Sequence, residues 1–127
     1  MAKNKAEGAR KWFFPDGYLP EVNAEGPMKS HEALMILNTG PKTAHLSLDI
    51  YFEDRDPARG IEVEVGAERV LCIRMDHPEQ LNGVQIPPLT QYALRIVSDR
   101  RVIIQFGRLD ATQANLAYYT TMGYACN

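Results

Sequence analysis

Three polar side chains that follow a hydrophobic segment are the residues of this sequence best suited to chemistry. Residues 102–104 are Val-Ile-Ile, and Gln105, Arg108 and Asp110 come within the next six positions. An amide, a guanidinium and a carboxylate could together bind a polar ligand, because they both donate and accept hydrogen bonds. Since a buried charge needs a partner, these groups either satisfy one another as internal struts or form the floor of a polar pocket.

The position of each side chain along the strand bears on this choice. In a regular strand Arg108 and Asp110 share one face, and Gln105 lies on the other. A β-bulge at Gly107 would bring all three together, and a glycine inside a strand often marks a bulge. Arg108 and Asp110 could equally form one internal salt bridge, so the sequence leaves both alternatives open.

Two further groups of polar residues could contact a ligand. His31 and Glu32 precede a hydrophobic segment, and in an extended chain they point to opposite faces. The structural alternative is that Glu32 pairs with an arginine. Arg69 and Arg74 flank another apolar segment, and their guanidinium groups suit carboxylates, phosphates or sugar hydroxyls, or else pair with nearby glutamates.

Sequence motifs of common catalytic and metal sites are absent. The chain has no GxSxG, Walker, GxGxxG or HExxH pattern, which makes an enzyme less expected without excluding acid–base chemistry. The three histidines, His31, His45 and His77, lack the spacing of metal ligands. We therefore predict no metal and no cofactor.

Alternation of hydrophobic and polar residues predicts an all-β fold. It is clearest over residues 44–52, where Leu46, Leu48, Ile50 and Phe52 would share one face. The same spacing recurs in the segments 61–65, 69–75 and 91–96. Several short strands separated by turn residues predict an antiparallel, jelly-roll-like β-sandwich with little helix.

Turn residues predict how these strands connect. The apolar segment 33–37 is followed by Asn-Thr-Gly-Pro at 38–41, so it should form a hairpin with the strand after it. Residues 99–101 should form a turn. Asp110 could cap a short helix over residues 111–118, because a carboxylate accepts backbone N–H bonds there. The aromatic side chains near the C-terminus should pack or form oligomer contacts; they are Tyr118, Tyr119 and Tyr124.

Length and composition suit one soluble globular domain. The 127 residues predict a flexible N-terminal tail over 1–11 and a β-sandwich ligand-binding domain over 12–127. A net charge of −2 argues against a dedicated nucleic-acid-binding protein. No apolar run is long enough for a signal peptide or a membrane span, so we expect no membrane insertion. Cys72 and Cys126 are expected to be free thiols in the cytoplasm, with Cys72 a small buried hydrophobic residue.

An ordered set of short motifs resembles the sensory rhodopsin transducer family over about residues 12–125. No single motif is specific, but their order along the chain is. The motifs include Gly17-Tyr18-Leu19-Pro20, Ser30-His31-Glu32, Tyr51-Phe52-Glu53-Asp54, Ala67-Glu68-Arg69, Arg108-Leu109-Asp110 and Gly123-Tyr124-Ala125.

This resemblance implies a compact β-sandwich that assembles as a cyclic homotetramer. It also implies a site for a sugar or related metabolite, and a membrane receptor as partner in some members. By this likeness the site residues would be His31, Glu32, Arg69, Gln105, Arg108 and Asp110, with Tyr51 and Arg74 as further candidates. Two positions depart from the family pattern: Cys72 stands where histidine is usual, and Gly107 where a polar residue is common.

The main expectation is therefore a sensory module that binds a small molecule. The alternative is a signalling interaction protein that docks a membrane receptor or another partner. An enzyme of sugar metabolism, with Asp110 or Glu32 as general acid or base, is less expected. DNA binding would require a tetramer to gather the basic residues of the N-terminal tail on one face.

Overall fold

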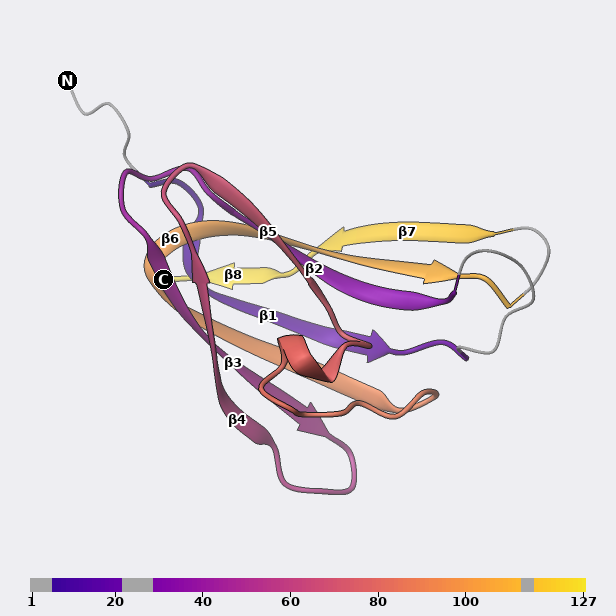
Figure 1. Ribbon diagram of the computed structural model, residues 1–127. Coiled ribbons are helices and arrows are strands. Elements are labelled where there is room, and N and C mark those ends of the chain that lie inside the picture. Colours follow the sequence, from indigo (N-terminus) through magenta and orange to yellow (C-terminus); the bar gives the residue numbers. More distant parts are fainter. Residues whose placement is uncertain (1–5, 22–28, 113–115) are drawn as a thin grey trace.

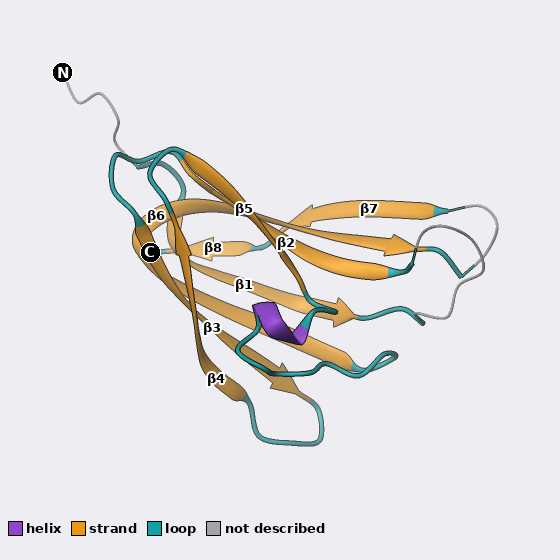
Figure 2. Ribbon diagram, in the orientation of Figure 1, coloured by secondary structure: helices purple, strands orange, loops and turns teal. Residues whose placement is uncertain are grey.

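Eight antiparallel strands make up most of the part of the chain that the structure describes. The computed structural model describes residues 6–21, 29–112 and 116–127. Within these residues the only helical element is the short 3₁₀ turn η1 (Pro78–Gln80), and Figure 2 shows how strands dominate the chain. The strands are β1 (Ala9–Tyr18), β2 (His31–Asn38), β3 (Ala44–Phe52), β4 (Ala58–Val65), β5 (Arg69–Arg74), β6 (Gln91–Asp110), β7 (Ala117–Met122) and β8 (Tyr124–Cys126).

Two sheets share the long strand β6, which Figure 1 shows curving from one sheet into the other. β6 pairs with β3 up to Ser98 and with β1 up to Val102; it then pairs with β2 from Ile103 and with β7 from Gln105. Sheet A thus has the order β4-β3-β6-β1-β8, and sheet B the order β5-β2-β6-β7. Strands that bend from one sheet into another make the corners of such sandwiches. The expected turn at 99–101 is therefore wrong, because the exposed residues there form this bend within a continuous strand.

Alternating side chains from both sheets fill the core between them. On β2 the inward residues are the even-numbered ones, and on the second part of β6 they are Val102, Ile104 and Phe106. Leu46, Leu48 and Ile50 of β3 are at most 3% exposed, as the alternation predicts. The all-β sandwich is confirmed. Where the apolar core ends, the next inward-facing residues of the strands are polar, and they form the site described in the next subsection.

The predicted hairpin between residues 33–37 and 44–52 is wrong. β2 pairs with β5 and β6 in sheet B, whereas β3 pairs with β4 and β6 in sheet A, so the connection over residues 39–43 crosses between sheets. The buried amide of Asn38 holds this crossing. Its Nδ2 donates to Lys42 O at 2.8 Å and to Val65 O at 3.1 Å, and its Oδ1 accepts from Gly40 N–H at 2.9 Å.

At both ends of the described chain, strands occupy residues that the sequence predicted to form a tail or a helix. β1 begins at Ala9, inside the segment expected to be a tail, because the Trp12 indole N–H donates to Ala9 O and Val102 O at 3.2 Å each. The helix expected over 111–118 is wrong where the structure describes it: β7 begins at Ala117 and pairs with β6, while 113–115 lie outside the described residues.

Candidate functional site

A buried ion pair closes one end of the sandwich. Glu32 of β2 lies directly opposite Arg108 of β6, one row beyond the last core residues of both strands. The Arg108 Nε donates to Glu32 Oε2 at 2.7 Å. The Glu32 side chain is fully buried, whereas 18% of the Arg108 side chain is exposed. Sheet pairing therefore makes this contact, since directly opposed residues in neighbouring strands bring their side chains together.

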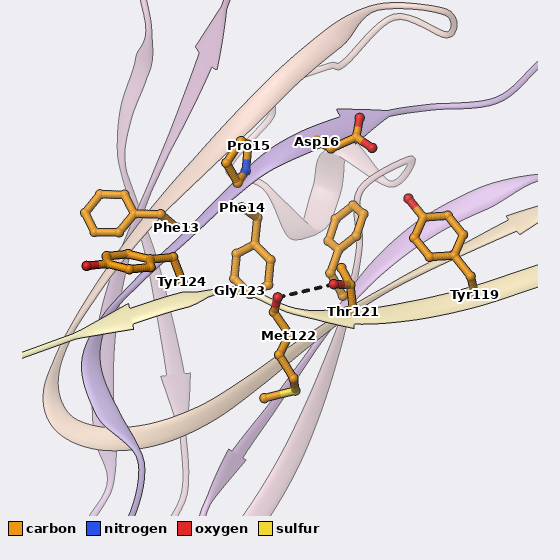
Figure 3. Close-up of a pocket in the computed structure, with 10 residues that line it drawn as sticks. Phe13, Phe14, Pro15, Asp16, Tyr119, Thr121, Met122, Gly123 and Tyr124 are labelled. Atoms are coloured by element: carbon orange, nitrogen blue, oxygen red, sulfur yellow. Dashed lines mark hydrogen bonds between the residues drawn. The ribbon is translucent and has the colours of Figure 1, made fainter.

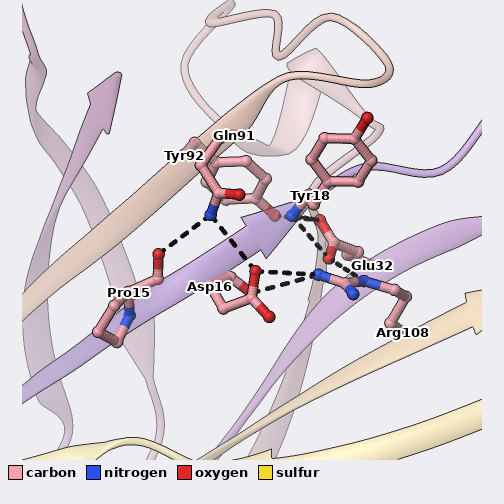
Figure 4. Close-up of polar contacts among 7 residues, drawn as sticks. All are labelled: Pro15, Asp16, Tyr18, Glu32, Gln91, Tyr92 and Arg108. Atoms are coloured by element: carbon pink, nitrogen blue, oxygen red, sulfur yellow. Dashed lines mark hydrogen bonds and ion pairs between the residues drawn. The ribbon is translucent and has the colours of Figure 1, made fainter. Parts of the chain in front are cut away.

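Glu32 has all its remaining acceptor positions used by the protein. The Tyr92 hydroxyl donates to Oε1 at 2.7 Å, and the Tyr18 backbone N–H reaches both carboxylate oxygens at 3.1 Å, as Figure 4 shows. No buried side-chain nitrogen or oxygen in the described chain lacks a hydrogen-bond partner. The geometry therefore favours the strut over the pocket for Glu32, because its carboxylate already joins β1, β2 and both parts of β6.

Arg108 extends this network to the surface. Its guanidinium carbon lies 5.0 Å from the centre of the Tyr119 ring, which is a cation–π contact. Its Nη2 donates to Asp16 O at 3.3 Å and lies 3.7 Å from Asp16 Oδ1. Glu32, Arg108, Asp16, Tyr92 and Tyr119 are named the end cluster below.

Burial and charge tune the titration of the end cluster. Burial, together with the adjacent Glu32 carboxylate, raises the pKa of Tyr92 well above its usual value. Burial would lower the pKa of Arg108, but its hydrogen bond and ion pair with Glu32 outweigh burial and raise it. Burial also raises the pKa of Tyr119, although the charge of Arg108 opposes it. Both tyrosines therefore stay neutral and Arg108 stays charged at neutral pH.

A small hollow adjoins the end cluster, between β1 and the β7–β8 segment (Figure 3). Its volume is about 210 Å³. Five aromatic rings line it, and Asp16 is its only charged lining residue. The complete lining is Phe13, Phe14, Pro15, Asp16, Phe106, Tyr119, Thr121, Met122, Gly123 and Tyr124.

The three residues Gln105, Arg108 and Asp110 do not converge. β6 pairs with β2 and β7 through Gly107 without a register shift, so of the two alternatives regular alternation holds, and Gln105 lies on the outer face of sheet B, on the other side from Arg108. The Asp110 carboxylate instead accepts hydrogen bonds from Thr112, from N–H at 2.9 Å and Oγ1 at 2.6 Å, and these bonds lower its pKa.

His31 and Arg69 lie at opposite ends of sheet B. The His31 ring nitrogen Nδ1 lies 3.0 Å from Lys29 O, and the side chain is on the opposite face of the strand from Glu32. Arg69 pairs with Asn38, seven residues away from His31 on β2, and its guanidinium donates to Glu68 O at 3.1 Å. Neither residue reaches the end cluster.

Arg74 and Tyr51 also have partners elsewhere. The Arg74 guanidinium binds both carboxylate oxygens of Asp76 at 2.8 Å. Tyr51 stands on the outer face of sheet A, where the guanidinium of Arg59 lies 5.5 Å from its ring centre. The structure therefore brings together only Glu32 and Arg108 of the eight residues taken from the sequence.

Sequence reasoning missed the aromatic members of the site. Tyr92 lies in an alternating strand, and its inward position was predictable, but its contact with Glu32 depends on β6 serving both sheets. Tyr119 was expected to pack or to form oligomer contacts, and the helix expected over 111–118 just before it hid its position opposite Arg108 on β7. For Asp16 the only signal in the sequence was its place in the turn sequence Pro-Asp-Gly at 15–17.

The outer face of sheet B carries an exposed apolar surface, here called the sheet B patch. Pairing across the strands forms two uncharged rows: Val70–Leu37–Ile103, and Cys72–Met35–Gln105–Met122. Val70 is 66% exposed, Met122 50% and Leu37 39%. Cys72 is exposed here, so the expectation that it is buried is wrong: its side chain faces outward and Ile73 faces the core.

The outer face of sheet A is charged instead. His45 lies between Glu64, 2.9 Å from its Nε2, and Asp99, 3.3 Å from its Nδ1. The described residues contain no group of three or more side chains arranged to hold a metal ion. They also contain no helix with the length and hydrophobicity needed to cross a membrane.

The fold and site together define a small β-sandwich with a buried, internally satisfied Glu32–Arg108 pair and one exposed apolar sheet face. A family model described as Anabaena sensory rhodopsin transducer matches residues 7–125. The chain belongs to this sensory rhodopsin transducer family.

Two solved structures show the likeness in detail. The crystal structure of Thermotoga maritima 1070 has a TM-score of 0.81 and 39% sequence identity, covering 94% of this chain and 96% of that one. The Anabaena sensory rhodopsin transducer has a TM-score of 0.69 and 32% identity, covering 86% of this chain and 96% of that one. No curated protein sequence matches the chain significantly.

Proposed function

We propose that this protein is a signalling module that works by binding other proteins, first of all copies of itself. Copies would pack through the sheet B patch into the cyclic homotetramer expected from the family, and the assembly would contact a receptor. The name of the Anabaena relative, a transducer of a sensory rhodopsin, supports a receptor as partner. The observation that carries the proposal is the sheet B patch.

The composition of the sheet B patch suits contact between copies. Contiguous apolar patches of this kind on a protein surface mark interaction sites. The interfaces of homodimers are more apolar than other interfaces, and charged residues are depleted at their centres. Neither row of the patch contains a charged residue, whereas the outer face of sheet A carries Glu62, Glu64 and Asp99.

The test is the mass of the protein in solution. Light scattering coupled to size exclusion should give four times the chain mass of 14.3 kDa for the wild type. Val70→Lys adds a charge to the patch at an exposed position and should shift the protein to smaller species. Val97→Lys, the same change on the outer face of sheet A, is the matched control and should leave the mass unchanged. A wild-type monomer, or a tetramer that tolerates Val70→Lys, would contradict the proposal.

The proposed location is the cytoplasm. Neither Cys72 nor Cys126 forms a disulfide, and free thiols are typical of a reducing compartment. Fluorescence microscopy of a tagged protein in its own cell would test this location, and a signal confined to the periplasm or the medium would contradict it.

A second function, binding of a sugar-like small molecule, is supported by the hollow beside the end cluster. Aromatic rings with a few polar groups at the rim are typical of ligand sites. The rim here is Asp16 and Tyr119, rather than the set expected from the sequence. A ligand at a hundred times its dissociation constant would stabilise the fold by about 2.7 kcal/mol. A thermal-shift screen with neutral, acidic and amino sugars tests this, and no shift with any of them would contradict it.

A further inference from the structure

We propose that the hollow between β1 and the β7–β8 segment binds a small organic cation of about the size of a trimethylammonium group. This inference rests on the proposed small-molecule function of the same hollow and adds the sign of the ligand's charge.

Aromatic rings supply most of the walls. The rings of Phe13 and Tyr124 lie 6.4 Å apart at an angle of 46°, and those of Phe14 and Phe106 lie 5.9 Å apart at 33°. Tyr119 completes the lining near Asp16 (Figure 3). Ring faces attract cations through their quadrupole, and aromatic cages are used to recognise quaternary ammonium groups.

Asp16 provides a carboxylate that the protein uses only weakly. Its side chain is 72% exposed. Its side-chain contacts are long: Gln91 Nε2 at 3.3 Å and Arg108 Nη2 at 3.7 Å, both to Oδ1. A carboxylate with a spare oxygen at the rim of an aromatic hollow favours a positively charged guest.

The charge balance of the end cluster also favours a cation. Glu32 and Asp16 carry two negative charges, and Arg108 carries one positive charge, which leaves one negative charge in excess. Tyr92 and Tyr119 add none, because both stay protonated at neutral pH. An acidic or phosphorylated ligand would meet no cationic side chain among the residues that line the hollow.

One cationic side chain of the protein itself, Arg108, already makes contacts of the proposed kind. The Arg108 guanidinium lies over the Tyr119 ring and pairs with Asp16 on the same side of the molecule. Because Arg108 is held by Glu32 at 2.7 Å, it is fixed at the edge of the hollow. Phe14 and Phe106 are buried in the core, so the accessible rings are those of Phe13, Tyr119 and Tyr124. The volume of about 210 Å³ is below the range of drug-sized sites, so the guest must be small.

The test compares choline chloride with 3,3-dimethylbutan-1-ol, which has the same shape without the charge. Binding to the full chain is measured by NMR titration of aromatic side-chain signals, with sodium chloride as the salt control. We expect choline to bind at least about tenfold more tightly than the neutral alcohol, because cation–π and carboxylate contacts together contribute about 1.4 kcal/mol or more, which is tenfold in affinity.

Variants locate the site. Asp16→Asn and Tyr124→Leu should each weaken choline binding about fivefold or more. Tyr118→Leu is the matched control, because Tyr118 is similarly exposed but does not line the hollow, and it should bind choline like the wild type. Circular dichroism of each variant checks that the fold is retained, which is expected because both substituted side chains are mostly exposed.

The outcomes separate this inference from the proposed small-molecule function. If the neutral alcohol or a neutral sugar binds as tightly as choline at the hollow, small-molecule binding stands and the cation inference is overturned. If choline binds but Asp16→Asn and Tyr124→Leu do not weaken it, the inference is overturned as well. If neither choline nor any sugar of the thermal-shift panel binds, both proposals are overturned.

Discussion

The buried pair of Glu32 and Arg108 makes a quantitative prediction about stability. Arg108→Met would leave the Glu32 carboxylate buried, with only the Tyr92 hydroxyl and the Tyr18 N–H as donors. Breaking a buried ion pair from one side costs about 3–5 kcal/mol. Since 18% of the Arg108 side chain is exposed and water can reach that side, we expect the lower end, about 3 kcal/mol.

A double-mutant cycle separates the pair from its surroundings. Glu32→Gln should cost a similar amount, because an amide cannot accept all three hydrogen bonds that the carboxylate accepts. The double variant should be less destabilised than the sum of the single variants, with a coupling energy of about 2 kcal/mol, because no buried charge is left without a partner.

Urea unfolding followed by the fluorescence of Trp12 measures these energies. Trp12 is the only tryptophan and is 5% exposed, so its emission reports the loss of the core. Arg69→Met is the control, because the described hydrogen bonds of this exposed side chain go only to backbone carbonyls of its own turn; its effect should stay within about 0.5 kcal/mol. Two results would refute the structural role of the Glu32–Arg108 pair. One is single variants that lower the free energy of unfolding by less than about 1 kcal/mol; the other is a double variant whose loss equals the sum of the two single losses.

Three further predictions also use urea unfolding, followed by Trp12 fluorescence except in Trp12→Phe, which lacks the only tryptophan and is followed by circular dichroism. Gly107→Ala places a Cβ 2.6 Å from the Tyr118 hydroxyl, the end of a side chain that is 61% exposed and can swing aside; we expect a loss of less than about 1 kcal/mol, and a larger loss would contradict this exposed placement of Tyr118. Trp12→Phe removes the indole N–H that donates to two backbone carbonyls and should cost about 1 kcal/mol or more. Asp76→Asn should cost about 1 kcal/mol at pH 7. Burial would raise the pKa of Asp76, but the hydrogen bonds and charge of Arg74 outweigh it and lower the pKa, so the wild type loses this stability as pH falls through that lowered pKa. The unfolding curves of Asp76→Asn and the wild type should therefore converge in acid, and a constant difference would contradict the ion pair.

Local sequence patterns predicted which segments form strands and which side chains face the core. They predicted less well how the strands are connected. Alternation over 44–52 placed Leu46, Leu48 and Ile50 in the core correctly, because period-two burial is a property of a single strand. The turn sequence after Asn38 did not make a hairpin, because the Asn38 amide instead donates to the carbonyls of Lys42 and Gly66, in two different connections, and the chain passes to the other sheet. Such long-range choices have no signal in the local sequence.

The candidate site was predictable only in part for the same reason. Simple alternation separated Gln105 from Arg108 correctly, and pairing of Glu32 with an arginine was one of the alternatives. What the sequence could not supply was the bend of β6, which brings Tyr92 from one sheet to Glu32 in the other. A bulge at Gly107 was one of the alternatives; the strand stays regular there, and the glycine allows the close approach of the Tyr118 hydroxyl.

The most direct test of the central claim is the reactivity of Cys72, which lies within the sheet B patch and is exposed in the single chain. In a Cys126→Ser background, Cys72 is the only thiol, and its reaction with a thiol reagent reports whether the patch is covered. We predict slow labelling of the assembled protein, and fast labelling when Val70→Lys is introduced. Equally fast labelling of both proteins at all protein concentrations would show that copies do not meet through this face and would contradict the account.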